Sequence, residues 1–344
     1  MIWKGTGGAY PEAPHMYNIN SQYYLMVAEG GTEYGHMETI ARSSHPYGPF
    51  EPYPNNPILS NRSMKSSIHA TGHADLIEAQ DGTWWAVCLG IRPVSYPMAH
   101  HLGREVYLAP VTWSADGWPI IGNEGHIEPV MNGPKLPEFI CPEKPVRDNF
   151  NDAKLALEWN FLRNPVQGSW SLEEEPGYLI LHGNNTSLDE KGSPAFVGRR
   201  LCHFNCKIEA MMEYEPLSDG EEAGLTIYMN ERFHYDLAIK TTKGRKIVVF
   251  RKTVGSLKVE ESRDCPNGPI VLQIQAHPKK FVASIRTSES EMMDIGWGET
   301  HFLSTEVAGG FTGVYVAMYA TSKTGTSAPV SFDWFDYEPL NLSS

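Results

Sequence analysis

The sequence predicts an all-β protein with two domains. Its 31 glycines and 25 prolines divide the chain into short segments, and these residue types mark turns. No long segment places apolar residues at helical spacing, whereas many short stretches alternate or run apolar as strands do. A length of 344 residues leaves room for two domains, each with a core of its own.

The composition also limits the partners and the compartment. A net charge of −13 argues against nucleic acid, because phosphate contacts dominate its binding. No basic region followed by an apolar run opens the chain, and no stretch approaches the roughly 20 apolar residues that span a bilayer. An odd number of scattered cysteines predicts free thiols and a cytoplasmic location; they are Cys88, Cys141, Cys202, Cys206 and Cys265.

The first half of the chain reads as strands joined by turns. Residues 22–28 form an apolar run dense enough for a buried strand. Residues 43–70 are a polar connection with five prolines, which we expect at the surface. Asp81-Gly82 between two apolar segments predicts a hairpin. Residues 129–147, again with five prolines, read as a linker.

The second half predicts a β-sandwich over residues 148–344. Turn residues separate many short alternating segments at the spacing of such a fold. The clearest of these segments are 177–182, 207–214, 225–229, 233–239, 246–250, 271–276, 281–286 and 314–319.

Glu12 is the first candidate for chemistry. It lies in Pro11-Glu12-Ala13-Pro14, and the two prolines favour an extended backbone that enters a strand. A carboxyl group fixed in this way suits general-acid work. The alternative is a surface glutamate in a proline-rich turn.

Seven short motifs, taken in order, resemble the second half of the catalytic domain of glycoside hydrolase family 43, in its β-xylosidase and α-L-arabinofuranosidase branch. They are Glu12-Ala13-Pro14-His15-Met16-Tyr17, Glu29-Gly30-Gly31-Thr32, Ala41-Arg42-Ser43, Asn56-Pro57-Ile58-Leu59, Thr71-Gly72-His73-Ala74-Asp75-Leu76, Leu102-Gly103-Arg104-Glu105 and Asp116-Gly117-Trp118-Pro119. The resemblance implies a partial five-bladed β-propeller, about its last two blades, over residues 1–128. A linker at 129–147 and a jelly-roll-like sandwich at 148–344 would follow.

The implied activity is exo-acting hydrolysis, with inversion, that releases xylose or arabinofuranose from hemicellulose-derived oligosaccharides. Glu12 matches the general acid of the family. Nothing here matches two upstream aspartates, one of which is the general base. Two alternatives therefore stand beside the enzyme: a catalytically weak carbohydrate-binding or assembly module, and one half of a split glycosidase.

The resemblance also implies binding residues. Arg104, Thr32, His36 and Phe311 correspond to substrate-binding positions, and His73 to a histidine near which some members hold calcium. Zinc shared between His73 and His69 is rejected, because it would need a further ligand. An incomplete propeller would expose apolar surface, which predicts a homo-oligomer or a partner chain that covers it.

Overall fold

The computed structural model describes residues 2–142, 144–287, 290–325 and 327–340. Antiparallel sheets make up nearly all of its regular structure, which confirms the all-β prediction. Contacts divide the chain into two compact units, Met1–Ser95 with Arg104–Cys141 and Tyr96–Gly103 with Pro142–Ser344. The boundaries expected at 1–128, 129–147 and 148–344 stay a prediction. None of the helices in the described part of the chain is long and apolar enough to cross a membrane.

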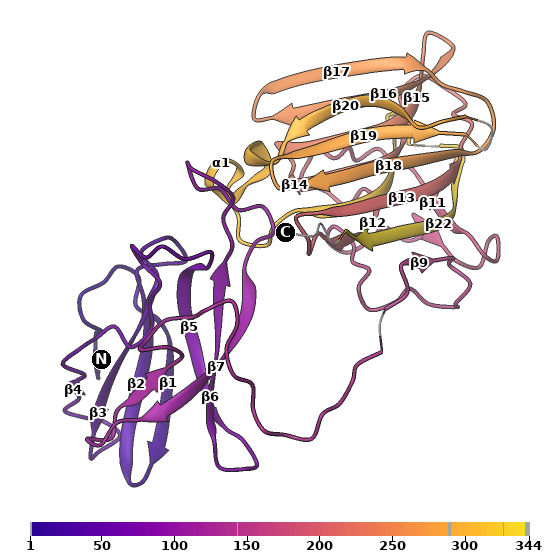
Figure 1. Ribbon diagram of the computed structural model, residues 1–344. Helices are drawn as coiled ribbons and strands as arrows, with labels where there is room; N and C mark the ends of the chain where they lie inside the picture. The colour runs from indigo at the N-terminus through magenta and orange to yellow at the C-terminus, as the bar shows by residue number, and fades with distance from the viewer. Residues whose placement is uncertain (1, 143, 288–289, 326, 341–344) are drawn as a thin grey trace. The chain divides into compact units, whose positions relative to one another are not determined.

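The first unit contains two four-stranded antiparallel sheets (Figure 1). One sheet has the order β1 (Glu12–Ile19), β2 (Gln22–Glu29), β3 (Met37–Ser43) and β4 (Glu51–Pro52). The other has the order β5 (His69–Glu78), β6 (Trp84–Ile91), β7 (Glu105–Trp113) and β8 (Pro119–Ile121). Both sheets contribute to one buried core, to which Met26 and Ile40 come from the first sheet and Leu76 and Ala86 from the second.

Turn chemistry accounts for the hairpins of this unit. Asn20 and Ser21 have φ values of 51° and 63°, and they connect β1 to β2 in the two-residue turn that such values favour. The predicted Asp81-Gly82 hairpin is confirmed between β5 and β6. There the Asp81 carboxylate accepts a hydrogen bond from the backbone N–H of Thr83 at 3.0 Å.

The second unit is a sandwich of two antiparallel sheets (Figure 1). The eight-stranded sheet contains β9 (Arg147–Asp148), β10 (Trp170–Ser171), β11 (Leu179–His182), β13 (Cys206–Glu213), β18 (Ile270–His277), β19 (Lys280–Arg286), β20 (Met293–Glu299) and β22 (Pro329–Pro339). The six-stranded sheet contains β12 (Ala195–Arg200), β14 (Glu221–Asn230), β15 (Phe233–Thr242), β16 (Arg245–Val254), β17 (Leu257–Asp264) and β21 (Tyr315–Ser322). The short helices η1 (Thr300–Leu303) and α1 (Thr305–Ala308) precede β21.

Alternation along the strands builds the sandwich core. Leu225 and Leu237 of the six-stranded sheet and Ile208 and Leu272 of the other sheet are all buried in one cluster. The opposite face of the six-stranded sheet instead carries a buried network of charged side chains around His234.

The loop Tyr96–Gly103 connects β6 to β7 in the first unit, yet its residues belong to the second unit. Leu102 is 1% exposed and is part of the sandwich core. The ring of His101 packs edge-on against Phe204 and Phe281. The sandwich core therefore includes residues from a distant part of the sequence.

Close backbone contacts hold this loop. A Cβ atom at Gly103 would lie 2.4 Å from the backbone nitrogen of Gly313, and one at Gly313 would lie 2.3 Å from the Leu102 carbonyl. Both glycines have positive φ, 76° and 75°, which other residues adopt only at a cost. The Glu306 carboxylate binds the backbone N–H of His100 at 2.9 Å and its Nδ1 at 2.7 Å.

Candidate functional site

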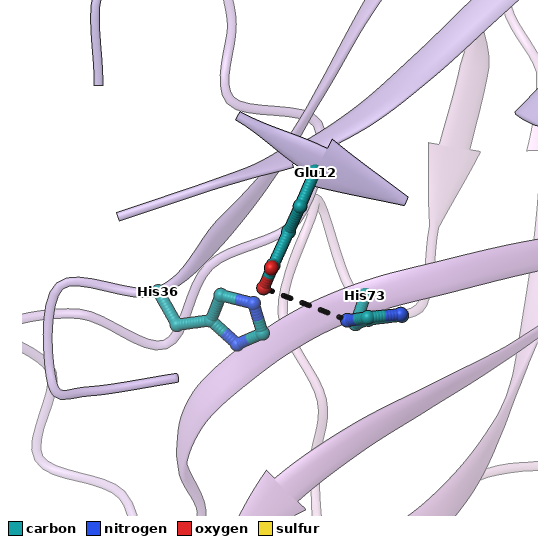
Figure 2. A group of neighbouring side chains, drawn as sticks. All are labelled: Glu12, His36 and His73. Carbon is teal, nitrogen blue, oxygen red and sulfur yellow. Dashed lines mark ion pairs between the residues drawn. The ribbon is translucent and has the colours of Figure 1, made fainter. Parts of the chain in front are cut away.

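Three predicted site residues meet within the first unit. Glu12 is the first residue of β1, His36 ends the loop before β3, and His73 lies in β5. One ligand atom of each lies within 4.8 Å of those of the other two. Glu12 Oε1 and His73 Nδ1 are 3.9 Å apart. Figure 2 shows the Glu12 carboxylate directed toward both imidazole rings.

An irregularity at the start of β1 positions Glu12. The pairing register of β1 with β2 shifts between Glu12 and His15, and Ala13 has a φ of 48°. A β-bulge of this kind redirects a side chain at the end of a strand. The Glu12 side chain is 48% exposed, so a substrate in solvent can reach its carboxyl group.

His36 is buried and fixed in one tautomer. Its Nδ1 lies 2.9 Å from the Ala70 carbonyl, which only accepts, so Nδ1 carries the proton. Nε2 then holds a lone pair, and it is buried without a hydrogen-bond partner. Burial lowers the pKa of His36, and the nearby His73 and Arg104 lower it further, so the ring is neutral at pH 7. Gly72 leaves room for this ring, because a Cβ there would lie 2.9 Å from it.

The remaining predicted residues occupy different places. Arg104 lies directly before β7, and its charge acts on His36, which places it near the cluster. Thr32 is half-buried in the loop that leads to His36. Phe311 belongs to the second unit and is 53% exposed. His69, the alternative zinc partner of His73, directs Nε2 to the Ser66 carbonyl at 2.8 Å and is not in the cluster.

Sequence reasoning missed Glu38, whose buried carboxyl group binds the backbone next to His73. Glu38 is fully buried, and its Oε2 accepts the backbone N–H of Ala74 at 2.9 Å. Burial raises its pKa to about 8, although the backbone N–H groups of Ala74 and His73 oppose the shift. These bonds hold His73 at a φ of 52°, a conformation that costs about 1–3 kcal/mol. No sequence signal marks Glu38, because it stands within an ordinary strand pattern.

Glu29 has a structural role. It opens the motif Glu29-Gly30-Gly31-Thr32, and its carboxylate accepts the backbone N–H groups of Thr6 at 2.7 Å and Gly8 at 2.6 Å. The hydroxyl of Thr39 donates to the same group at 2.6 Å. Glu29 therefore anchors the segment that leads to Glu12.

The chemistry available in the cluster follows from these groups. Glu12 offers a partly exposed carboxyl group that can transfer a proton, a role such groups fill in general acid catalysis. His36 offers a fixed acceptor, and Arg104 offers a planar set of donors for hydroxyl groups. Of the three clustered residues, only Glu12 is a carboxylic acid.

Two family profiles match the chain. The profile described as glycosyl hydrolases family 43 matches residues 1–119. The profile described as the beta xylosidase C-terminal concanavalin A-like domain matches residues 147–338, which is more than half of the chain.

Named relatives span nearly the whole chain. A non-reducing end α-L-arabinofuranosidase of Bacteroides ovatus is 43% identical over 99% of this chain and 65% of its own length. A β-xylosidase of Bacillus subtilis is 29% identical over 98% of this chain and 67% of its own length. The chain thus spans about two thirds of the length of these relatives.

Solved structures show the same likeness. The structure of a Bacteroides ovatus protein of a xyloglucan locus has a TM-score of 0.95 at 43% identity, covering 98% of this chain and 68% of the other. A xylan β-1,4-xylosidase from Bacillus halodurans has a TM-score of 0.93 at 34% identity, covering 98% and 66%.

Proposed function

Because this chain belongs to glycosyl hydrolase family 43, we propose that it acts in the exo-hydrolysis of xylose or arabinofuranose units from hemicellulose-derived oligosaccharides. The observation that carries the proposal is the convergence of Glu12, His36 and His73 from three separate elements. The pentose class is supported by the relatives, one named as an arabinofuranosidase and another as a β-xylosidase.

In this proposal Glu12 is the general acid that protonates the leaving oxygen of the glycosidic bond. Arg104 and His36 bind hydroxyl groups of the terminal sugar, since one offers donors and the other a fixed acceptor. Thr32 and Phe311 are proposed as further substrate-binding residues.

An inverting reaction needs a second carboxylate about 6.5–9.5 Å from the first, where it activates water. We do not assign this base to a residue of the chain. Glu38 is unsuitable, because its raised pKa keeps it protonated at neutral pH and its side chain is buried. We propose that a carboxylate outside the described residues supplies this base.

We also propose that the two sheets of the first unit are blades of an incomplete propeller. Support comes from one face of the β5–β8 sheet, where Ile77, Val87, Val106 and Leu108 are 58%, 39%, 78% and 48% exposed. Val87 pairs with Leu108 across two strands. Contiguous apolar surface is rarely left in solvent, so we propose that a second copy or a partner chain covers this face.

The test of the acid uses leaving groups of different quality. Glu12→Gln should lower kcat/KM by about 10²- to 10⁴-fold on xylosides or arabinofuranosides with a poor leaving group. The loss should be much smaller on a dinitrophenyl glycoside, because its dinitrophenolate leaving group departs without protonation. His45→Gln, at an exposed histidine, is the matched control. An equal loss on both substrates would refute the role of Glu12.

Activity assays with and without an added upstream polypeptide distinguish three alternatives: a homo-oligomeric enzyme, a split glycosidase and a binding module. Activity of the purified chain alone supports a homo-oligomeric enzyme. Activity that appears only with a polypeptide carrying the upstream part of a family 43 propeller supports a split glycosidase. Xylo-oligosaccharide binding without turnover in either case supports a binding module.

A further inference from the structure

We propose that the sandwich carries a second binding site for neutral saccharides, on the face of its six-stranded sheet that lies opposite the core. A cavity of about 640 Å³ opens there, lined by residues of β14, β15, β16 and β17 and of the loop before β12. This volume lies within the roughly 300–1,000 Å³ of small-molecule sites. The choice of sugar rests on the proposed function, whereas the cavity and its chemistry do not.

Strand pairing gathers the polar side chains of this cavity. Glu222 pairs with Lys240 across β14 and β15, and Arg251 pairs with Glu260 across β16 and β17. Successive residues of a strand point to opposite faces, and Phe250, which precedes Arg251, is buried in the sandwich core. One face of a single sheet therefore supplies these groups, away from the core.

Ion pairs hold the most accessible of these groups in place. Lys240 Nζ lies 2.8 Å from both carboxylate oxygens of Glu260. Lys258 Nζ lies 2.6 Å from the carboxylate of Asp189, which comes from the loop before β12. A ligand that binds groups already fixed in position loses less free energy to their ordering. The two ion pairs are thus suited to recognition.

The charges of the cavity nearly cancel. Its lining contains five aspartate or glutamate residues, against four lysine or arginine residues and His234. Although burial opposes it, Asp236 and Asp189 raise the pKa of His234 to about 9, so this ring is protonated at neutral pH. The one further carboxylate, Asp236, is fully buried and binds both His234 and Arg251. No excess of cations is left for an anionic ligand, and the lining fits a neutral one.

The two ion pairs still offer hydrogen bonds to a ligand. The side chains of Lys240 and Glu260 are 20% and 34% exposed, and those of Lys258 and Asp189 are 50% and 36% exposed. An ammonium group has three donors and a carboxylate about four acceptor sites, so each pair presents both kinds. A hydroxyl group also donates and accepts. Neighbouring hydroxyls of a pentose can therefore bind both members of a pair, whereas an apolar ligand would remove these groups from water without compensation.

Such a site would act on long substrates. It belongs to the second unit, whereas Glu12, His36 and His73 belong to the first. A second binding site on the same chain raises the effective concentration of a ligand long enough to reach both sites. We expect it to lower KM for long oligosaccharides and to leave the hydrolysis of short aryl glycosides unchanged.

Isothermal titration calorimetry with xylohexaose tests binding without reference to activity. The protein carries Glu12→Gln and Arg104→Ala, so that the proposed active site neither cleaves nor holds the probe. This protein should still bind xylohexaose. Adding Lys240→Ala together with Glu260→Ala should weaken binding by at least about 10-fold, the scale of lost hydrogen bonds to charged groups. Because both partners are removed, neither is left without its counter-charge.

Matched variants complete the design. Lys207→Ala with Glu338→Ala removes a similar pair, 2.9 Å apart and 34% and 43% exposed, from the eight-stranded sheet and should leave xylohexaose affinity unchanged. Lys258→Ala, at the second ion pair of the cavity, should weaken binding and provides the test if the double variant does not fold. Equal affinity in all variants would overturn the site. Tighter binding of an oligogalacturonide or of spermine than of xylohexaose would also overturn it.

Failure of this inference can be distinguished from failure of the proposed function. Hydrolysis of nitrophenyl pentosides by the native chain, with no xylohexaose binding to the Glu12→Gln/Arg104→Ala protein, would overturn the sandwich site alone. Binding that Lys240→Ala with Glu260→Ala removes, with no hydrolysis even after an upstream family 43 polypeptide is added, would support the sandwich site and contradict the proposed activity.

Discussion

His234 in the sandwich should make stability depend on pH, and His234→Gln should remove much of that dependence. The side chain is 1% exposed on β15. Its Nδ1 lies 2.9 Å from Asp236 on the same strand, and its Nε2 lies 3.2 Å from Asp189 in the loop between β11 and β12. Lys258 from β17 binds Asp189 at 2.6 Å, and Arg251 from β16 binds Asp236 at 3.0 Å.

The magnitude follows from these contacts. Burial alone would lower the pKa of His234, but Asp236 and Asp189 outweigh it and raise the pKa from 6.5 to about 9. One pKa unit corresponds to about 1.4 kcal/mol, so the charged ring contributes up to about 3 kcal/mol. Because the folded pKa is raised, this contribution is fully present below about pH 6.5 and disappears as the pH rises through about 9.

Pulse proteolysis in urea measures the free energy of unfolding of the sandwich as the loss of a resistant fragment. His234→Gln should cost about 2–3 kcal/mol at pH 6 and under about 1 kcal/mol at pH 9.5. His182→Gln is the control, because the His182–Glu174 pair is 34% and 49% exposed and exposed pairs contribute little. A His234→Gln cost that is the same at both pH values would refute the reasoning.

Three further outcomes are expected. Gly103→Ala should destabilise the sandwich by more than about 1 kcal/mol in the same assay, because a positive φ and a contact of 2.4 Å with the Gly313 backbone both oppose a Cβ; an unchanged midpoint would contradict the close approach. Glu38→Gln should raise Tm relative to the native chain, and the difference should grow from pH 5 to pH 8, since the raised pKa of about 8 makes ionisation in the folded state costly over that window. A Tm difference that stays constant over this range would contradict the raised pKa. Light scattering at micromolar concentration should give a mass well above 38.5 kDa, and a dilution-resistant monomer would remove the proposal of a covered sheet face.

Local sequence patterns predicted much of the fold. Alternation located the strands of the sandwich core, and Asp81-Gly82 located a hairpin. Spacing along the chain could not show that His36 approaches Glu12 and His73, because a register shift at Glu12 and the loop that ends at His36 bring them together.

Burial of polar groups was the least predictable feature. Glu38 stands in the strand Met37–Ser43 with no mark of its pKa. Glu29, the first residue of a family-like motif, binds backbone N–H groups near the start of the chain. His101 directly precedes the motif Leu102-Gly103-Arg104-Glu105, and its ring packs within the sandwich. Each of these outcomes depends on tertiary packing, which a single sequence does not record.

The loop Tyr96–Gly103 has a consequence for how this protein can be divided. A polypeptide starting at Pro142 would retain every strand of the sandwich and still lack Leu102, a deletion comparable to a core truncation that costs about 2–5 kcal/mol. Chimaeras that exchange the sandwich between relatives at the proline-rich segment would meet the same defect, unless the loop is exchanged with it. The sequence that builds the sandwich is therefore discontinuous. Among relatives, substitutions at Leu102 should be accompanied by changes in the sandwich-core residues that pack against it.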